Sequence, residues 1–268
     1  MLGIPVHTLL GGARRARVRV YASGFLYQEG RHPAEVWPAE AVDLVERGFR
    51  SLKLRIGGYP AEEELPLLAR LREDLPADVT LMVDAWGSYD AVTAERVGRR
   101  LGELGVAWFE EPCPALPAGL ADRLEVPIAG GEMGRTATEL VDLIDSGALD
   151  VVQPDAAICG GLGAAQIVGV AAARRGVRCV PHTWNGAVMA AATLHLAAAL
   201  PLAARTGDGT AGPLLEYDTS ENPFMCDVVV DPPRLVDGCF TVPDSPGLGV
   251  ELDERALDRF VVDRYTCP

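Results

Sequence analysis

The chain has 268 residues, of which 49% are hydrophobic, and a formal net charge of -14. This length suits one large domain and excludes a second of equal size. The acidic balance argues against nucleic acid or an anionic membrane as a partner, because binding phosphate groups requires a basic surface. The six cysteines show no metal-ligand spacing, so free thiols in a cytoplasmic protein are the simplest interpretation.

Strand and helix patterns alternate along most of the chain. Strands are predicted at residues 17–22, 51–56, 80–84, 107–110, 127–130, 151–154, 178–181 and 213–217. Helical patterns follow at residues 33–47, 61–73, 91–104, 118–124, 136–146, 161–175 and 187–200. Such alternation is typical of a parallel sheet covered by helices, which describes both a barrel and an open doubly wound sheet.

An alanine-rich run at residues 186–204 is long enough to suggest a membrane span. It contains His195 and Pro201, however, and a buried barrel helix explains it better. His195 is then predicted to be a core histidine and not a ligand.

Five of the predicted strands lead into an acid or a histidine, namely Asp84, Glu110, Glu132, Asp155 and His182. Because the carboxyl ends of parallel strands meet on one side of a sheet, these side chains should surround one site. In a barrel that side is the rim where active sites lie. The acids favour the barrel, because the strands of an open sheet would not curve back to face His182.

Three of these acids suggest a metal. Asp84, Glu110 and Glu132 would raise one another's pKa at close range unless a cation lay between them. Mg2+ suits a few hard oxygen ligands on rigid strands, so these three are predicted to bind it. The alternative is that each acid is a solvated loop residue or a helix cap. Glu111 should point to the opposite face of its strand and act as a structural hydrogen-bond acceptor.

Several segments of the chain resemble one known family. They are Asp84, residues 108–112, residues 130–132, residues 154–161, Pro181-His182 and the ending at residues 242–250. Together they resemble the enolase superfamily, specifically its mandelate racemase and muconate lactonising branch. The resemblance implies an α/β fold with a TIM-type (β/α)7β barrel, and abstraction of a proton α to a carboxylate with Mg2+ holding the resulting enediolate. It also implies a small-molecule carboxylate substrate and a homo-oligomer.

The resemblance also predicts how the chain is divided. Residues 1–15 look like the end of a capping domain, residues 16–220 like the catalytic barrel, and residues 221–268 like a tail that packs on it. Family members carry an α+β capping domain that closes the site over the substrate. The sequence is expected to begin at the end of that domain, and catalysis is expected to suffer without a lid.

Position 155 separates two subgroups of the branch. Racemase-like members carry an aspartate there that pairs with a histidine on the next strand, whereas lactonising-like members carry a lysine. Asp155 and His182 match the first pattern. The aspartate would fix the imidazole tautomer and favour its protonated form, which suits a general acid and base. A purely structural pair is the alternative.

The second strand departs from the family pattern. Such enzymes usually present Lys-x-Lys there, with the second lysine as a base, but this chain reads Lys53-Leu54-Arg55. Both charged side chains should face the barrel mouth, because they are two residues apart. Arg55 is a poor base, since its guanidinium stays protonated, and it is predicted to bind or polarise a carboxylate or hydroxyl. Glu216 completes the candidate catalytic set of His182, Asp155, Lys53, Arg55 and Glu216.

Three functional hypotheses follow. The first is a Mg2+-dependent acid-sugar dehydratase, a lyase in which His182 removes the α-proton and returns it to the departing hydroxyl. The second is a racemase or epimerase of a 2-hydroxy acid, and the third is a truncated barrel without activity. A two-base racemase needs a base on each side of the substrate carbon. Arg55 fails that role, so dehydration is preferred.

Overall fold

Eight parallel strands form the centre of the protein. The computed structural model describes residues 2–203 and 212–263. Neighbouring strands are hydrogen-bonded in the order β7-β6-β5-β4-β3-β2-β1-β8. They are β1 (Arg17–Ser23), β2 (Ser51–Arg55), β3 (Thr80–Asp84), β4 (Phe109–Glu110), β5 (Ile128–Gly130), β6 (Val151–Val152), β7 (Arg178–Cys179) and β8 (Leu215–Asp218).

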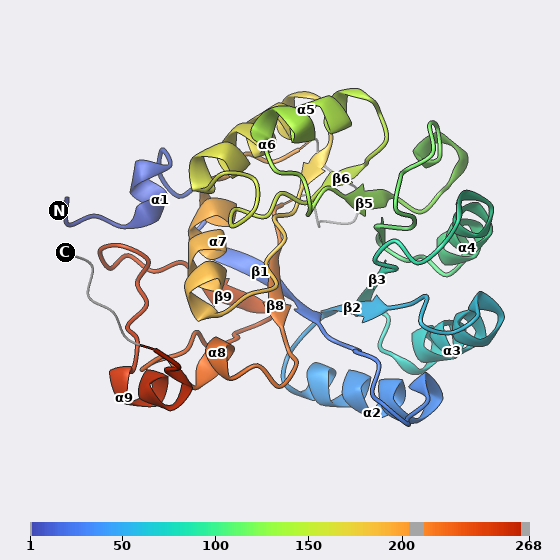
Figure 1. Cartoon of the computed structure of the whole chain (residues 1–268), viewed down its shortest axis with the longest axis horizontal. Coiled ribbons are helices and arrows are strands. Elements are labelled where there is room, and N and C mark those ends of the chain that lie inside the picture. The colour runs from blue at the N-terminus through green and yellow to red at the C-terminus, as the bar shows by residue number, and fades with distance from the viewer. Residues whose placement is uncertain (1, 204–211, 264–268) are drawn as a thin grey trace.

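Helices surround the curled sheet on the outside, as Figure 1 shows. The longer ones are α2 (Pro33–Glu46), α3 (Ala61–Asp74), α4 (Ala91–Glu103), α5 (Ala137–Asp145), α6 (Leu162–Arg174) and α7 (Ala187–Ala199). Helices α2 to α6 each lay one buried face on the strands, whereas α7 is buried nearly all round. In α4 the buried face consists of Ala94, Val97 and Leu101, at the spacing of one helix face. The predicted α/β barrel class is confirmed.

The barrel has two apolar layers. The larger one fills the space between sheet and helices, and a smaller one lies inside the sheet. The inner layer consists of Tyr21, Met82, Trp108, Ala129, Val151, Val180 and Leu214. These side chains close the floor of the barrel, so polar groups at the strand ends lie above an apolar base.

The seam of the barrel lies between β7 and β8. Within the described residues no backbone ladder joins these two strands. The backbone N–H of Thr183, which follows β7, instead donates to Oε2 of Glu216 on β8 at 3.1 Å. A buried side chain therefore links the two ends of the sheet.

Residues 118–124 do not form the predicted helix. The structure has a single 3-10 turn there, η1 (Ala121–Arg123). Gly119 has a φ of +68°, a left-handed conformation that interrupts a helix. The few residues that remain cannot supply enough backbone hydrogen bonds to offset the cost of starting one.

The chain after β8 returns along the outside of the barrel. It forms α8 (Pro223–Cys226), β9 (Cys239–Thr241), α9 (Glu254–Leu257) and η2 (Asp258–Phe260). β9 pairs antiparallel with the start of β1. α1 (Val6–Leu9) joins this tail, since the N–H of Val6 donates to the carbonyl of Gly247 at 2.9 Å. Residues 264–268 of the predicted tail lie outside the described residues.

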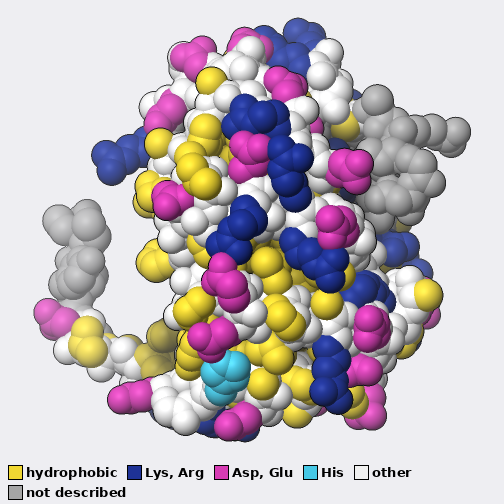
Figure 2. Space-filling model, turned by 90° about the vertical axis from the view of Figure 1, so that its right-hand side faces the viewer, with side chains coloured by type: hydrophobic (Ala, Val, Ile, Leu, Met, Phe, Trp, Pro, Cys, Tyr) yellow, Lys and Arg dark blue, Asp and Glu magenta, His cyan; other side chains and the backbone are white. Residues whose placement is uncertain are grey.

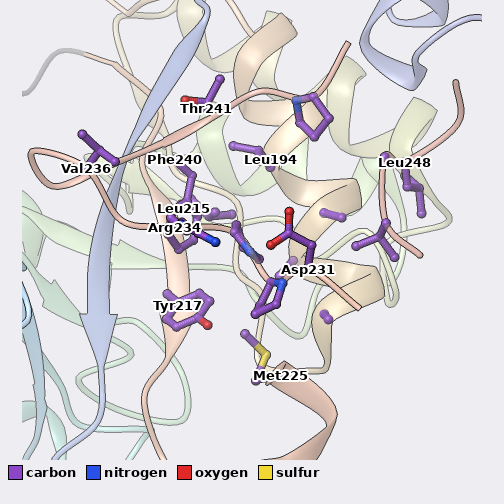
Figure 3. A pocket seen from close by; sticks show the side chains of 18 residues that line it. Leu194, Leu215, Tyr217, Met225, Asp231, Arg234, Val236, Phe240, Thr241 and Leu248 are labelled. Carbon is purple, nitrogen blue, oxygen red and sulfur yellow. The ribbon is translucent and has the colours of Figure 1, made fainter. Parts of the chain in front are cut away.

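A cavity of about 300 Å³ lies between α7, β8 and the tail. In Figure 3 Leu215 and Tyr217 of β8 point into it. Glu216 lies between them in the strand and therefore points the other way, into the barrel. The same strand thus supplies an apolar outer surface and a polar inner group.

Charged side chains of both signs are interspersed over α3 and α4, the face that Figure 2 shows. They include the ion pairs Arg96–Glu62, Arg99–Glu95 and Arg100–Glu103. Exposed pairs of this kind contribute little to stability.

Across residues 2–203 and 212–263, no helix combines the length and apolar character needed to cross a bilayer. The five cysteines in this part of the chain are free thiols.

His195 is a core histidine, as predicted. Its side chain in α7 is fully buried. Nδ1 accepts a hydrogen bond from the backbone N–H of His7 at 3.2 Å, and Nε2 lies 3.1 Å from the carbonyl oxygen of Leu248. Because Nδ1 accepts, the neutral ring carries its proton on Nε2 and donates it to Leu248. The imidazole therefore joins α1, α7 and the tail.

We expect acid to weaken this junction. Burial lowers the pKa of His195. The unfolded chain then binds the proton more readily, so stability is present above the unfolded pKa of about 6.5 and is lost as pH falls towards the folded value. Urea unfolding should show wild type losing stability relative to His195→Gln between pH 7.5 and pH 5, with the gap constant above pH 7.5. A gap that stays constant over the whole range would contradict the assignment.

Candidate active site

The only lysine of the chain lies at the centre of the site. Lys53 on β2 is 1% exposed. Its Nζ lies 2.6 Å from Oε1 of Glu110, 2.6 Å from Oε1 of Glu216 and 3.6 Å from Oδ2 of Asp84. A compact ammonium with three N–H groups suits three carboxylates around one point, which a planar guanidinium does not.

The charge of Lys53 is fixed by these neighbours. Burial alone would lower the pKa of its ammonium, but Glu110, Glu216 and Asp84 together raise it above its ordinary value. Burial also raises the pKa of Glu110, whereas Lys53 and His182 outweigh burial and lower the pKa of Glu216. Lys53 is therefore a permanently charged counter-ion for these buried carboxylates. It lies inside the barrel on the predicted face, but below the groups that line the mouth.

Glu110 is held at both oxygens. Its Oε2 accepts hydrogen bonds from Nε1 of Trp108 at 3.0 Å and from Nε2 of Gln153 at 2.8 Å. Trp108 and Gln153 were not among the predicted site residues. Each lies two residues before a predicted site residue, Glu110 and Asp155, and alternation along an extended chain places such residues on the same face. This two-residue spacing could have identified Trp108 and Gln153 from the sequence.

Arg55 forms an ion pair with Asp84. Its Nη1 contacts Oδ2 of Asp84, and the two residues are register partners on β2 and β3. Oδ1 of Asp84 accepts the backbone N–H of Trp86 at 2.8 Å. The guanidinium carbon lies 5.1 Å from the ring centroid of Trp184, within the range of a cation–π contact. Burial lowers the pKa of Arg55, but Asp84, Glu110 and Glu216 raise it overall.

His182 pairs with Asp155, as the sequence predicted. Nδ1 lies 2.8 Å from Oδ2 of Asp155, whose Oδ1 accepts the backbone N–H of Ala157 at 2.7 Å. Nε2 lies 3.4 Å from Oε2 of Glu132 and 3.9 Å from Oε2 of Glu216. Burial would lower the pKa of His182, but Glu216 and the bond to Asp155 raise it to about 9. The imidazole is therefore fixed in orientation, with Nε2 towards the acids.

Glu111 is a structural acceptor, as predicted. Its Oε1 accepts the backbone N–H of Gly131 at 2.7 Å. Gly131 has a φ of +100°, which a residue with a side chain rarely adopts. The carboxylate therefore stabilises the turn that carries Glu132 into the barrel mouth.

The donor chemistry of the site suits Mg2+. Asp84 and Glu110 are register partners on β3 and β4, and Glu132 follows β5. Five buried carboxylates, adding Asp155 and Glu216, surround Lys53, Arg55 and the imidazole of His182, so the acids outnumber the cationic side chains. A dication would balance part of this excess negative charge.

The same carboxylates are engaged with protein cations. Among the described residues, no three His, Cys, Asp or Glu side chains form a group that is arranged to hold a metal. Lys53 and Arg55 contact Asp84, and Lys53 also contacts Glu110. The assignment of Asp84, Glu110 and Glu132 as ligands stays a prediction.

A cavity of about 620 Å³ opens above these groups. Arg55, Asp84, Glu132, Asp155 and His182 line its polar part. Its rim is largely apolar and includes Leu26, Tyr27, Trp86, Ile158 and Trp184. A concave site of this size, with a few charged groups at its base, suits a small polar molecule.

Comparison with known proteins identifies the family. The family model described as enolase C-terminal domain-like matches residues 37–256. D-galactarolactone cycloisomerase of Agrobacterium fabrum is 35% identical over 96% of this chain and 69% of its own length. Arabinonate dehydratase of Saccharolobus solfataricus is 33% identical over 96% of this chain and 66% of its own length.

Solved structures agree with this result. L-talarate dehydratase from Polaromonas sp. JS666, complexed with Mg and L-glucarate, superposes with a TM-score of 0.80 at 29% identity. The match covers 96% of this chain and 67% of that one. The chain thus spans about two thirds of the length of these three relatives. It belongs to the enolase superfamily, among relatives of the mandelate racemase and muconate lactonising type.

Proposed function

We propose that this chain carries the catalytic barrel of a Mg2+-dependent acid-sugar dehydratase. The observation that carries the proposal is the His182–Asp155 pair, with Nδ1 held at 2.8 Å and Nε2 directed to the polar base of the cavity. Relatives that are named dehydratases of arabinonate and of L-talarate support a sugar acid as the substrate class.

Each group of the site has a task in this reaction. Asp155 keeps the proton of His182 on Nδ1, so Nε2 takes the proton α to the substrate carboxylate and returns it to the departing β-hydroxyl. The C–H and C–O bonds break, water leaves, and the enol becomes a 2-keto-3-deoxy acid. Mg2+, held by Asp84, Glu110 and Glu132, would stabilise the negative charge that develops on the substrate carboxylate. Arg55 binds a carboxylate or hydroxyl of the substrate.

Racemisation is disfavoured because it needs a second base. Lys53 is buried among three carboxylates, and Arg55 carries a permanent charge. Neither can take a proton at neutral pH. Cycloisomerisation is the second candidate, since it also needs one proton transfer and since a relative at 35% identity is named a cycloisomerase.

A substrate screen in D2O tests the proposal. We expect the Mg2+-loaded protein to convert at least one aldonic or aldaric acid to a 2-keto-3-deoxy acid, detected by NMR and by semicarbazone absorbance. EDTA should abolish the conversion. Isomerisation of a lactone without loss of water would favour the cycloisomerase, and interconversion of α-epimers would favour a racemase. Mg2+ binding without turnover of any acid or lactone would favour the inactive barrel.

A further inference from the structure

The guanidinium of Arg55 contacts the carboxylate oxygen of Asp84 that does not accept the backbone hydrogen bond of Trp86. Oδ1 of Asp84 is engaged by the N–H of Trp86 at 2.8 Å, so Oδ2 is the oxygen through which this residue would bind a metal. Oδ2 contacts Nη1 of Arg55 and lies 3.6 Å from Nζ of Lys53. A protein cation therefore lies where the predicted metal ligand would meet its ion.

Sheet register fixes this contact. Arg55 and Asp84 are directly paired on neighbouring parallel strands, and Asp84 is paired in turn with Glu110. Side chains at paired positions point to the same face, so Arg55 lies in the same row as the first two predicted ligands. Lys53 lies two residues deeper on β2. The two cations thus have different positions, one beneath the acids and one within their row.

We infer that Arg55 competes with Mg2+ for Oδ2 of Asp84, and that metal binding moves the guanidinium into the cavity. The inference rests on the proposed function for the identity of the metal. Two cations on one carboxylate oxygen repel each other strongly at low dielectric constant. Trp184 also lines the cavity, 5.1 Å from the guanidinium, and its ring can hold the displaced cation there. Metal binding would then present Arg55 to a substrate carboxylate.

Calorimetric titration with MgCl2 at fixed ionic strength tests this inference. Arg55→Gln should bind Mg2+ roughly tenfold more tightly than wild type, because a charge-assisted contact no longer has to break. Arg17→Gln is the matched control. It removes the same charge from β1, where Arg17 is paired with the exposed Asp237. Arg55→Lys should give an intermediate affinity, because a shorter point charge pairs less well with Asp84, and it also serves if Arg55→Gln does not fold.

A second measurement reports the movement of Arg55 without any turnover. Mg2+ should change the tryptophan fluorescence of wild type as the guanidinium shifts over Trp184, and the change should be absent in Arg55→Gln. The fluorescence of Arg17→Gln should respond as in wild type.

The outcomes separate the two proposals. Equal or weaker Mg2+ affinity in Arg55→Gln than in Arg17→Gln would overturn the competition, even if the enzyme dehydrates a sugar acid. Failure of both wild type and Arg55→Gln to bind Mg2+ would overturn the competition and the Mg2+-dependent function together. Tighter binding by Arg55→Gln with no turnover of any acid would support the competition alone.

Discussion

Replacing Lys53 with methionine should lower the free energy of unfolding by about 3–5 kcal/mol at pH 7. The substitution removes the charge between Glu110, Glu216 and Asp84 and leaves their carboxylates buried together. Methionine fills a similar volume, so lost packing is not the main cause. Urea unfolding followed by circular dichroism measures the effect. A Lys53→Met protein as stable as wild type would contradict the role of Lys53 as a counter-ion.

Two further variants separate charge from geometry. Lys53→Arg keeps the charge but brings a planar group into a position built for an ammonium, and should also be less stable than wild type. Adding Glu216→Gln to Lys53→Met removes one of the uncompensated acids and should restore part of the stability. Two additive effects would show that the residues do not interact.

Acid should partly rescue Lys53→Met. Without the ammonium, burial and mutual repulsion raise the pKa of the Glu110 and Glu216 carboxyls above their unfolded values of about 4.3. A group with a raised folded pKa favours the folded state at low pH and loses that contribution as pH rises. The stability deficit of the variant should therefore shrink between pH 7 and pH 5. Since Lys53 is the only lysine, amine modification located at Lys53 by mass spectrometry also reports its burial in the native wild type.

The polar side chains at the strand ends can be placed from the sequence because parallel strands follow a simple geometric rule. Parallel strands bring their carboxyl ends together, so Asp155 and His182 could be placed on one side of the sheet. The family resemblance then implied that they pair, and the structure joins them at 2.8 Å. The failed helix at residues 118–124 shows the limit of this reasoning. A short apolar segment with a glycine is compatible with a helix or a turn, and the local backbone conformation determines which of the two forms.

The ion-pair partners of Lys53 and Arg55 cannot be deduced from the alternation of residues along β2. Both were placed on the correct face of β2, but which of them meets which acid depends on strand register. Two missed signals were present. A single lysine among 24 basic residues suggests a position where arginine does not fit. The alternation that placed Arg55 would also have placed Trp184, two residues after His182, in the same cavity.

The second large effect concerns His182. Its replacement by asparagine should lower the rate of α-proton exchange and of dehydration by a factor of about 10²–10⁴, the usual contribution of a general base. Asparagine can still donate a hydrogen bond to Asp155 and is of similar size, so the barrel should remain folded. Rapid-quench or NMR assays in D2O measure both rates on the substrate that the screen identifies.

Asp155→Asn is the matched variant for the His182 substitution. Its amide would donate to Nδ1 of His182, which places the imidazole proton on Nε2 and removes the base from the atom that faces the cavity. We expect kcat to fall with little change in KM, because the substrate contacts remain. Mg2+ affinity should stay within about twofold of wild type in both variants, since neither side chain is a predicted ligand. If His182→Asn retains wild-type exchange, another group removes the proton and the assignment of His182 fails; a large loss of Mg2+ binding would instead place His182 among the groups that hold the metal.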